Sequence, residues 1–206
     1  MTDLIIDAES LGQSVFTCPV VNFSIFKFDP QKFKSDEPYS YDEVLNNIVV
    51  FKLNVTEQVK KYGYIIEKSS LSFWEKRPDD VRKQITPSSK DLYIDEFCTK
   101  FIAEIENDNI KYWWSRSNTF DPVLLYRLFN TVNLTDRLNK VLKFWRVRDI
   151  RTFIDAKADF ALDFNAFIPI DEKEWKEKFK EHDSKHDVTA DVLRMQRLVR
   201  IENGLK

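Results

Sequence analysis

The pattern of apolar and polar positions predicts strands in the first quarter of the chain. Leu4–Ile6 is an apolar run that stops abruptly at Asp7, which is typical of a short buried strand. Val20–Phe28 alternates between apolar and polar residues, and Ile48–Leu53 has the composition of a third strand. Together the three segments predict an antiparallel meander.

Further along the chain, apolar residues recur mainly at helical spacing. We expect helices over Glu57–Lys61, Ser72–Ile85, Asp91–Glu106, Pro122–Phe129, Asp171–Glu181 and Val188–Ile201, and strands over Ile110–Trp114 and Val147–Ile150. Gly63 is expected to end the first of these helices. Strands followed by alternating helices and strands predict an α/β domain with a mixed central β-sheet flanked by α-helices.

The composition suits one globular domain over residues 1–206. The chain is 43% hydrophobic and contains 17 Phe, enough for a sizeable core. We expect a cytoplasmic protein, because no basic leader precedes an apolar stretch and no apolar run reaches membrane-spanning length. Cys18 and Cys98 lie far apart without a CxxC neighbour, which argues against a disulfide framework and against a zinc site.

The charges nearly cancel, so contact with nucleic acid is expected only at a local site. Charged residues make up 32% of the chain, yet the formal net charge is -2. The densest basic stretch is Arg137–Arg151, in which Phe144 and Trp145 are interleaved. This stretch fits a solvated helix end and a phosphate-contacting surface equally well.

Candidate chemistry begins where the first strand ends. Asp7 and Glu9 are two residues apart on that strand, so their side chains point to the same face. Two carboxylates this close repel each other unless a cation lies between them or one is protonated. The alternative is a solvated strand end before the turn at Ser10–Gly12.

Asp121 and Asp191 are two further candidate carboxylates. Asp121 precedes Pro122, so it either caps an ordinary helix or holds a metal beneath a strand end, and the two roles are compatible. Asp191 shares the apolar stripe of the last helix with Val188 and Met195, and a carboxylate there needs a metal or a partner such as Arg194 or Arg151.

The chain has two histidines, each followed by an aspartate after four intervening residues. His182 is paired in this way with Asp187, and His186 with Asp191. Spacing alone does not choose between the pairs. Periodicity favours His186 and Asp191, because Asp187 is expected to cap the last helix while Asp191 faces inward. An imidazole at this position is a suitable general base.

Four stretches of the chain form a recognisable set: IIDAESLG at Ile5–Gly12, WWSRSNTFDPVLL at Trp113–Leu125, WRVRDIRTFID at Trp145–Asp155 and HDVTADVLRMQRLV at His186–Val199. With the candidate acids and histidine in this order, the chain resembles the DEDDh exonuclease superfamily. The resemblance is closest to the branch with the exonuclease A proteins of T-even bacteriophages and related bacterial exoribonuclease-like proteins. The resemblance spans nearly the whole chain. It implies a ribonuclease-H-like fold, two divalent metal ions, and release of nucleoside 5′-monophosphates from a 3′ end.

The resemblance also implies roles for individual residues. Asp7, Glu9, Asp121 and Asp191 would be the metal carboxylates, and His186 the base. Carboxylate oxygens favour Mg²⁺, with Mn²⁺ able to substitute, over zinc.

The resemblance also implies contacts to the nucleotide, where the chain departs from the superfamily pattern. Ser10, Leu11 and Phe120 would contact the terminal nucleotide, with Leu11 as a wedge against its base. Many members carry two threonines where this chain has Ser10 and Leu11. The segment Tyr39–Lys90 matches no motif of the superfamily.

The expected substrate is the 3′ end of single-stranded DNA, on the resemblance to phage proteins. RNA is the alternative, since a contact to the 2′-hydroxyl is not visible in sequence. Two other classes remain: a non-catalytic nucleic-acid-binding module, and a structural protein whose acids serve as caps and ion pairs. Metal-dependent nuclease activity separates the enzyme from both.

Overall fold

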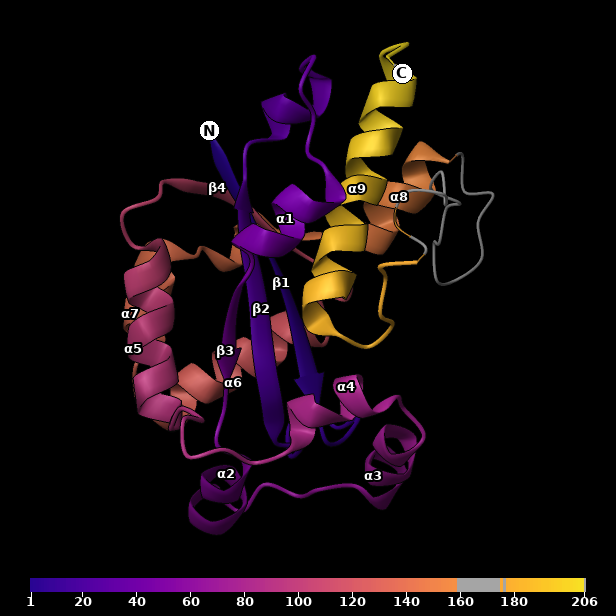
Figure 1. Ribbon diagram of the computed structural model, residues 1–206. Coiled ribbons are helices and arrows are strands. Elements are labelled where there is room, and N and C mark those ends of the chain that lie inside the picture. The colour runs from indigo at the N-terminus through magenta and orange to yellow at the C-terminus, as the bar shows by residue number, and fades with distance from the viewer. Residues whose placement is uncertain (159–174, 176, 206) are drawn as a thin grey trace.

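A twisted five-stranded sheet forms the centre of the protein in a computed structural model that describes residues 1–158, 175 and 177–205 (Figure 1). Its strands are β1 (Thr2–Ser10), β2 (Val20–Phe28), β3 (Val49–Lys52), β4 (Ile110–Ser115) and β5 (Val147–Asp149), in the spatial order β3-β2-β1-β4-β5. The first three pair antiparallel, while β4 runs parallel to β1 and β5 parallel to β4. The predicted meander and mixed sheet are therefore confirmed.

Helices cover both faces of the sheet. The helices are α1 (Tyr41–Asn47), α2 (Val55–Tyr62), α3 (Lys68–Glu75), α4 (Asp79–Arg82), α5 (Ile94–Ile105), α6 (Asp121–Thr131), α7 (Thr135–Val141), α8 (Ile150–Lys157) and α9 (Ser184–Glu202), with short 3-10 turns η1 (Pro30–Lys34), η2 (Lys83–Ile85) and η3 (Phe144–Arg146). Figure 1 shows α5, α6 and α7 on one side of the sheet and α8 and α9 on the other. Strands β1, β4 and β5 run in the same direction, so their carboxyl ends lie at one edge of the sheet.

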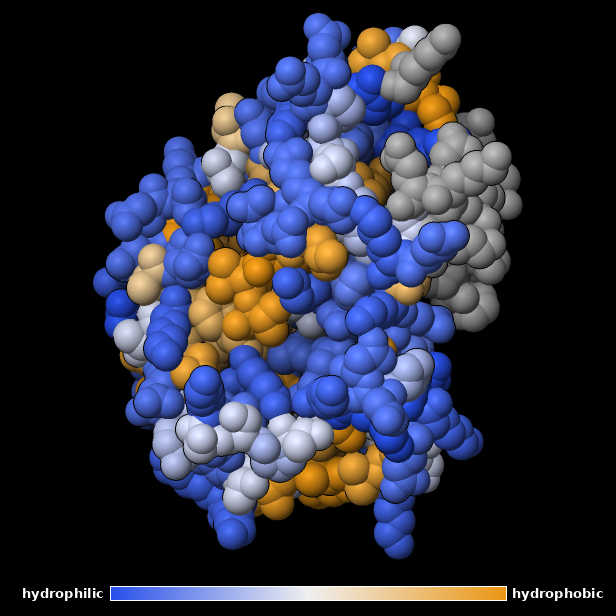
Figure 2. All heavy atoms as spheres, in the orientation of Figure 1, coloured by the Kyte–Doolittle hydropathy of each residue, from blue (hydrophilic) through white to orange (hydrophobic). Residues whose placement is uncertain are grey.

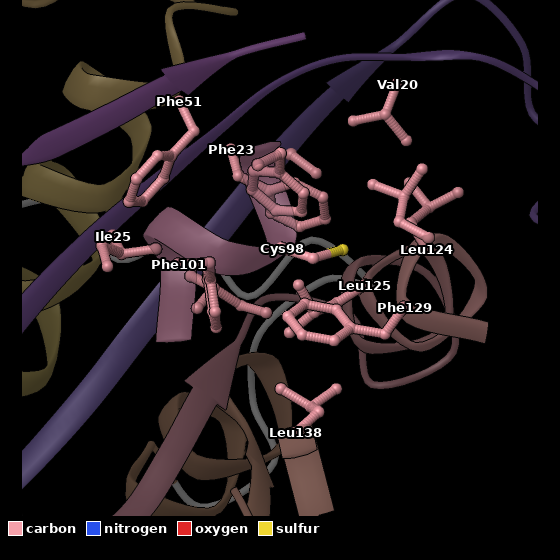
Figure 3. Close-up of a cluster of buried hydrophobic side chains, with 14 of the residues drawn as sticks. Val20, Phe23, Ile25, Phe51, Cys98, Phe101, Leu124, Leu125, Phe129 and Leu138 are labelled. Atoms are coloured by element: carbon pink, nitrogen blue, oxygen red, sulfur yellow. The ribbon is translucent and has the colours of Figure 1, made fainter. Parts of the chain in front are cut away.

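One face of β1 packs into a large aromatic core. Leu4, Ile6 and Ala8 alternate along the strand and lie in the same buried cluster as residues of α5, α6 and α7. Phe101 and Phe129, both fully buried, meet edge to face at 5.9 Å (Figure 3). Because each such ring removes a large apolar area from water, this cluster holds α5 and α6 against the sheet.

The opposite face of β1 packs against the last two helices. Ile5 lies in a second buried cluster with Ile150 and Ile154 of α8 and Val188 and Val192 of α9. Asp7 and Glu9 continue the register of Ile5, so they emerge on this face, at the edge where β1 ends.

The segment without a superfamily motif contains a group of helices beyond the end of β1, which we call the helical insert (residues 55–85). Figure 1 shows α4 beside the arrowhead of β1 and α2 and α3 below it. Trp74 is buried and donates from Nε1 to the carbonyl of Ser10 at 3.2 Å. Glu67 accepts hydrogen bonds from the backbone N–H groups of Gln13 and Ser14 at 3.0 and 3.1 Å. These contacts dock the helical insert onto the loop that follows β1.

Two features of that loop show how closely it packs against the insert. A Cβ at Gly12 would lie 2.6 Å from Cβ of Cys18 and 2.8 Å from a carboxylate oxygen of Glu67. Leu11 is buried with Trp74 and Val81 in a cluster of its own. Glycine is therefore required at position 12 for the close approach of the two segments.

Three expected helices differ from the structure. The helix expected over Ser72–Ile85 is broken into α3, α4 and η2, because Pro78 cannot continue a helix. The last helix begins at Ser184, with Asp183 as N-cap, so the expected capping role of Asp187 is wrong. In the helix expected over Asp171–Glu181, residues 171–174 and 176 lie outside the described residues, and 177–178 form a turn.

The surface in Figure 2 is largely hydrophilic, with apolar side chains gathered left of centre and along the lower edge. This agrees with the high content of charged residues. Among the helices that the structure describes, none combines the length and apolar character that a membrane span requires.

Candidate active site

Three carboxylates meet at the end of β1. Asp7 and Glu9 come from the strand, and Asp187 from the first turn of α9. One ligand atom of each lies within 4.8 Å of the ligand atoms of the other two. All three are partly accessible to solvent. Since carboxylate oxygens are the ligands that Mg²⁺ and Mn²⁺ prefer, this donor set fits a hard divalent cation.

Asp121 adds a fourth carboxylate to the same place. It is the first residue of α6, with Phe120 in the N-cap position, and it is only 4% exposed. Burial and the negative charge of Asp7 raise its pKa well above the usual value, although hydrogen bonds from the backbone of Ala8 oppose this. Asp121 therefore faces the acids of β1 from the start of a helix.

The acids disturb one another electrostatically. Burial, followed by the charge of Asp191, raises the pKa of Asp7 to about 7. Burial and the charge of Asp7 raise the pKa of Glu9 and that of Asp187 well above their usual values. A metal-free cluster of this kind holds protons near neutral pH, and a cation can replace them.

Asp191, predicted as the fourth metal carboxylate, is engaged in ion pairs. Its Oδ1 lies 2.9 Å from Nη1 of Arg194 and 3.1 Å from Nη2 of Arg116. All three side chains are largely buried. The alternative of an arginine partner, raised by the sequence, is thus present in the structure. Asp191 still lies close enough to Asp7 to raise its pKa.

The two histidines lie in different surroundings. His186, predicted as the base, is buried in an aromatic cluster, where its Nδ1 lies 2.5 Å from the hydroxyl of Tyr41. His182 instead lines the cavity that holds the carboxylates, and its side chain is 34% exposed. Its backbone has φ of 65°, which is rare for a residue other than glycine, and such strain is often found at functional sites.

The helical insert contacts His182 on one side. The ring of Phe73 meets the imidazole edge to face at 4.8 Å, and Nε2 of Gln84 donates to the carbonyl of His182 at 3.4 Å. Next to them, Lys180 pairs with Asp80 of α4 at 2.6 Å. The helical insert therefore holds part of the segment before α9.

The site opens into two adjoining cavities. The larger, of about 740 Å³, is lined by the carboxylates, by His182 and by three arginines. The smaller, of about 250 Å³, lies between β1 and α3 and is lined by Ser10, Ser70 and Phe73. Glu9, Phe120 and His182 line both. Of the predicted nucleotide contacts, Ser10 and Phe120 therefore lie on the smaller cavity, while Leu11 is only 4% exposed and packs beneath it.

The side chains of the basic stretch Arg137–Arg151 lie in different surroundings. Arg146 donates to the carbonyl of Ile110 at 3.0 Å, and Phe144 and Trp145 are more than half exposed beyond the start of β5. Arg151 alone of this stretch lines the larger cavity. The sequence predicted Asp7, Glu9 and Asp121 at this site but not Asp187, whose spacing to His182 was the available signal.

Two comparisons with known sequences match nearly the whole chain. A family model described as the 3′-5′ exoribonuclease Rv2179c-like domain matches residues 2–198. An exodeoxyribonuclease of enterobacteria phage T4 is 29% identical over 222 residues, covering 100% of this chain and 92% of the phage protein.

Solved structures of similar fold include two complexes of E. coli exonuclease I. The zinc-bound complex with single-stranded DNA gives a TM-score of 0.56 at 17% identity, covering 98% of this chain and 41% of that one. The complex with a 5cy-dA13 oligonucleotide gives 0.59 at 15% identity, covering 97% and 40%. The chain spans about two fifths of exonuclease I. At this identity the likeness concerns the fold, and it confirms the predicted ribonuclease-H-like architecture.

Proposed function

Because the chain belongs to the family of 3′-5′ exoribonuclease Rv2179c-like domains, we propose that it removes nucleotides from the 3′ end of a single strand with two divalent metal ions. Membership in this family makes it a 3′-5′ exonuclease of DNA or RNA, within the DEDDh superfamily that the sequence resembles. The ions, their ligands and the preferred sugar belong to the proposal.

The observation that carries the proposal is the meeting of Asp7, Glu9 and Asp187 within 4.8 Å at the end of β1. Asp121 faces them from the start of α6. We assign these four as the metal carboxylates, with Asp187 in place of Asp191, because Asp191 is paired with Arg116 and Arg194. These residues would hold two such ions, which would supply charge neutralisation at the phosphate and at the departing 3′ oxygen.

We assign the general base to His182 rather than to His186. The ring of His182 lines the cavity, and burial lowers its pKa below the ordinary 6.5, so at neutral pH it is uncharged and can accept a proton from water. His186 is directed to Tyr41 and has its Nδ1 occupied by that contact. Phe73 fixes the plane of the His182 ring from one side.

We favour single-stranded DNA, because the phage T4 relative is an exodeoxyribonuclease and the exonuclease I complexes contain DNA. RNA is the second candidate, since the matching family model is described as an exoribonuclease. Matched DNA and RNA single strands, labelled at the 5′ end and digested in Mg²⁺ or in EDTA, test both. A ladder that shortens from the 3′ end only with metal is expected, and no metal-dependent ladder on either strand would refute the proposal.

The two histidines provide a matched test of the base. We expect His182→Asn to lower kcat by about two to four orders of magnitude, the usual contribution of a positioned general base, while His186→Asn retains activity within about tenfold. The folded state of each variant is checked by circular dichroism. A large loss confined to His186→Asn would return the assignment to His186 and Asp191.

A further inference from the structure

The larger cavity has a basic wall beside the carboxylates. Arg116 follows β4, Arg151 lies in the first turn of α8, and Arg194 lies one turn after Asp191 on α9. Three separate elements therefore bring a guanidinium group to one cavity. The two-metal chemistry of the proposed function uses none of them.

A shared carboxylate holds two of these arginines, Arg116 and Arg194. Asp191 lies between Arg116 and Arg194: its Oδ1 accepts a hydrogen bond from Nη1 of Arg194 and forms an ion pair with Nη2 of Arg116, so one buried carboxylate holds two guanidinium groups. Within residues 1–158, 175 and 177–205, no carboxylate lies at ion-pair distance from Arg151, and its buried Nε has no acceptor there. Buried polar groups of this kind usually have a partner, and an anion in the cavity would supply one.

The three cations lie within electrostatic range of one another. The pKa of Arg116 is lowered by burial and by the charges of Arg194 and Arg151, while Asp191 raises it. Arg151 in turn acts on Asp121, whose pKa it lowers. Guanidinium groups clustered beside a metal-binding site favour a phosphate, because the planar fork pairs with two of its oxygens.

The smaller cavity indicates which part of a strand would reach this wall. Glu9 and His182 line both cavities, whereas the three arginines line only the larger one. The smaller cavity is walled by α3 and by Phe120, an aromatic surface that suits a terminal nucleoside. A strand whose last nucleoside lies there passes the carboxylates at its scissile phosphate and continues toward the arginines.

We propose that Arg116, Arg151 and Arg194 form a binding site for the phosphate immediately upstream, on the 5′ side, of the phosphate that is cleaved. This rests on the proposed function. Arg151 makes the direct contact with that phosphate, and Asp191 is a positioning residue that orients the other two. The enzyme thereby recognises two consecutive phosphates and not one.

The test compares a dinucleotide that has one phosphate with the same dinucleotide bearing a 5′-phosphate. For the wild-type chain we expect kcat/KM to be about 10- to 100-fold higher with the second phosphate, the usual effect of a charge-assisted hydrogen bond. Arg151→Gln should lose most of this advantage, chiefly through KM. Arg148→Gln is the matched control: it removes the same charge from a side chain that lies over Tyr112, at 4.2 Å, and should keep the advantage.

The outcomes separate this proposal from the proposed function. If the wild type hydrolyses both dinucleotides equally, or if Arg151→Gln lowers both rates by the same factor, the upstream phosphate site is wrong while the exonuclease stands. If neither dinucleotide nor any longer strand is hydrolysed, the proposed function fails. Fluorescence anisotropy with labelled forms of the two dinucleotides then decides the phosphate site. At least tenfold tighter binding of the form with the 5′-phosphate, lost in Arg151→Gln, supports the site, and equal binding refutes it.

Discussion

Replacing Asp7 with Asn should stabilise the metal-free protein at alkaline pH, although it removes a proposed metal ligand. The pKa of Asp7 is raised to about 7 from 3.8, mainly by burial and then by Asp191. The stability associated with the protonated carboxyl is therefore fully present below pH 3.8 and is lost as the pH rises through 7. Above pH 7 the carboxylate is charged in both states, and the charge is unfavourable only in the native state, where it is buried beside Asp191.

The size of the effect follows from the difference between the two pKa values. About 3 pH units correspond to about 4 kcal/mol, at about 1.4 kcal/mol for each unit. Asp7 is partly accessible, so part of this charge penalty is screened, and we expect Asp7→Asn to raise the free energy of unfolding by about 2 kcal/mol at pH 8. At pH 4 the variant and the wild type should differ little, because the acid is then protonated in the native state.

Urea unfolding in EDTA at pH 4, 6 and 8 measures this difference, provided that the m-values of the two proteins agree. Adding Mg²⁺ at pH 8 should reverse the order, since a ligand that binds the native state stabilises only the protein that can hold it. A variant that is less stable than the wild type at pH 8 in EDTA, or a difference that does not shrink toward pH 4, would refute the reasoning.

Substitutions at three further positions separate positioning from catalysis. Asp191→Ala should destabilise the fold by about 3 kcal/mol, because it removes the carboxylate that Arg116 and Arg194 share. Asp187→Ala should instead abolish Mg²⁺-dependent activity and leave the denaturation midpoint unchanged or raised. Equal midpoints for the two variants would contradict the distinction. Phe73→Ala should lower kcat more than it raises KM, and it should shift the acidic limb of the pH profile. Phe73→Trp should restore both kcat and the pH profile. A change in KM alone would make Phe73 only a substrate contact.

The parts of the site that lie on the sheet could be predicted from the sequence. Strand β1 has a period of two, so placing Ile5 in the core also places Asp7 and Glu9 on one face at its end. The expected strands agree with the observed ones to within a few residues, because buried β-branched and aromatic runs leave little choice of register.

The part of the site that depends on α9 could not be predicted in the same way. The sequence placed the start of this helix at Val188, and the observed start at Ser184 adds one turn. That turn carries Asp187 from a capping position to the cavity, and it turns His186 toward Tyr41. The two His-x-x-x-x-Asp pairs have identical spacing, so only tertiary contacts, such as that of Phe73 with His182, distinguish them.

The docking of the helical insert divides the site into two parts of different origin. Asp7 and Glu9 are anchored in the central strand of the sheet, where opening requires global unfolding. His182 is held by Phe73 and Gln84, and the insert itself is tied down mainly through Trp74 and Glu67. A local opening of a few short helices would therefore detach the proposed base while leaving the metal-binding acids assembled. Metal affinity and turnover thus depend on different parts of the fold, the first on β1 with the starts of α6 and α9, and the second on the hold of a peripheral segment.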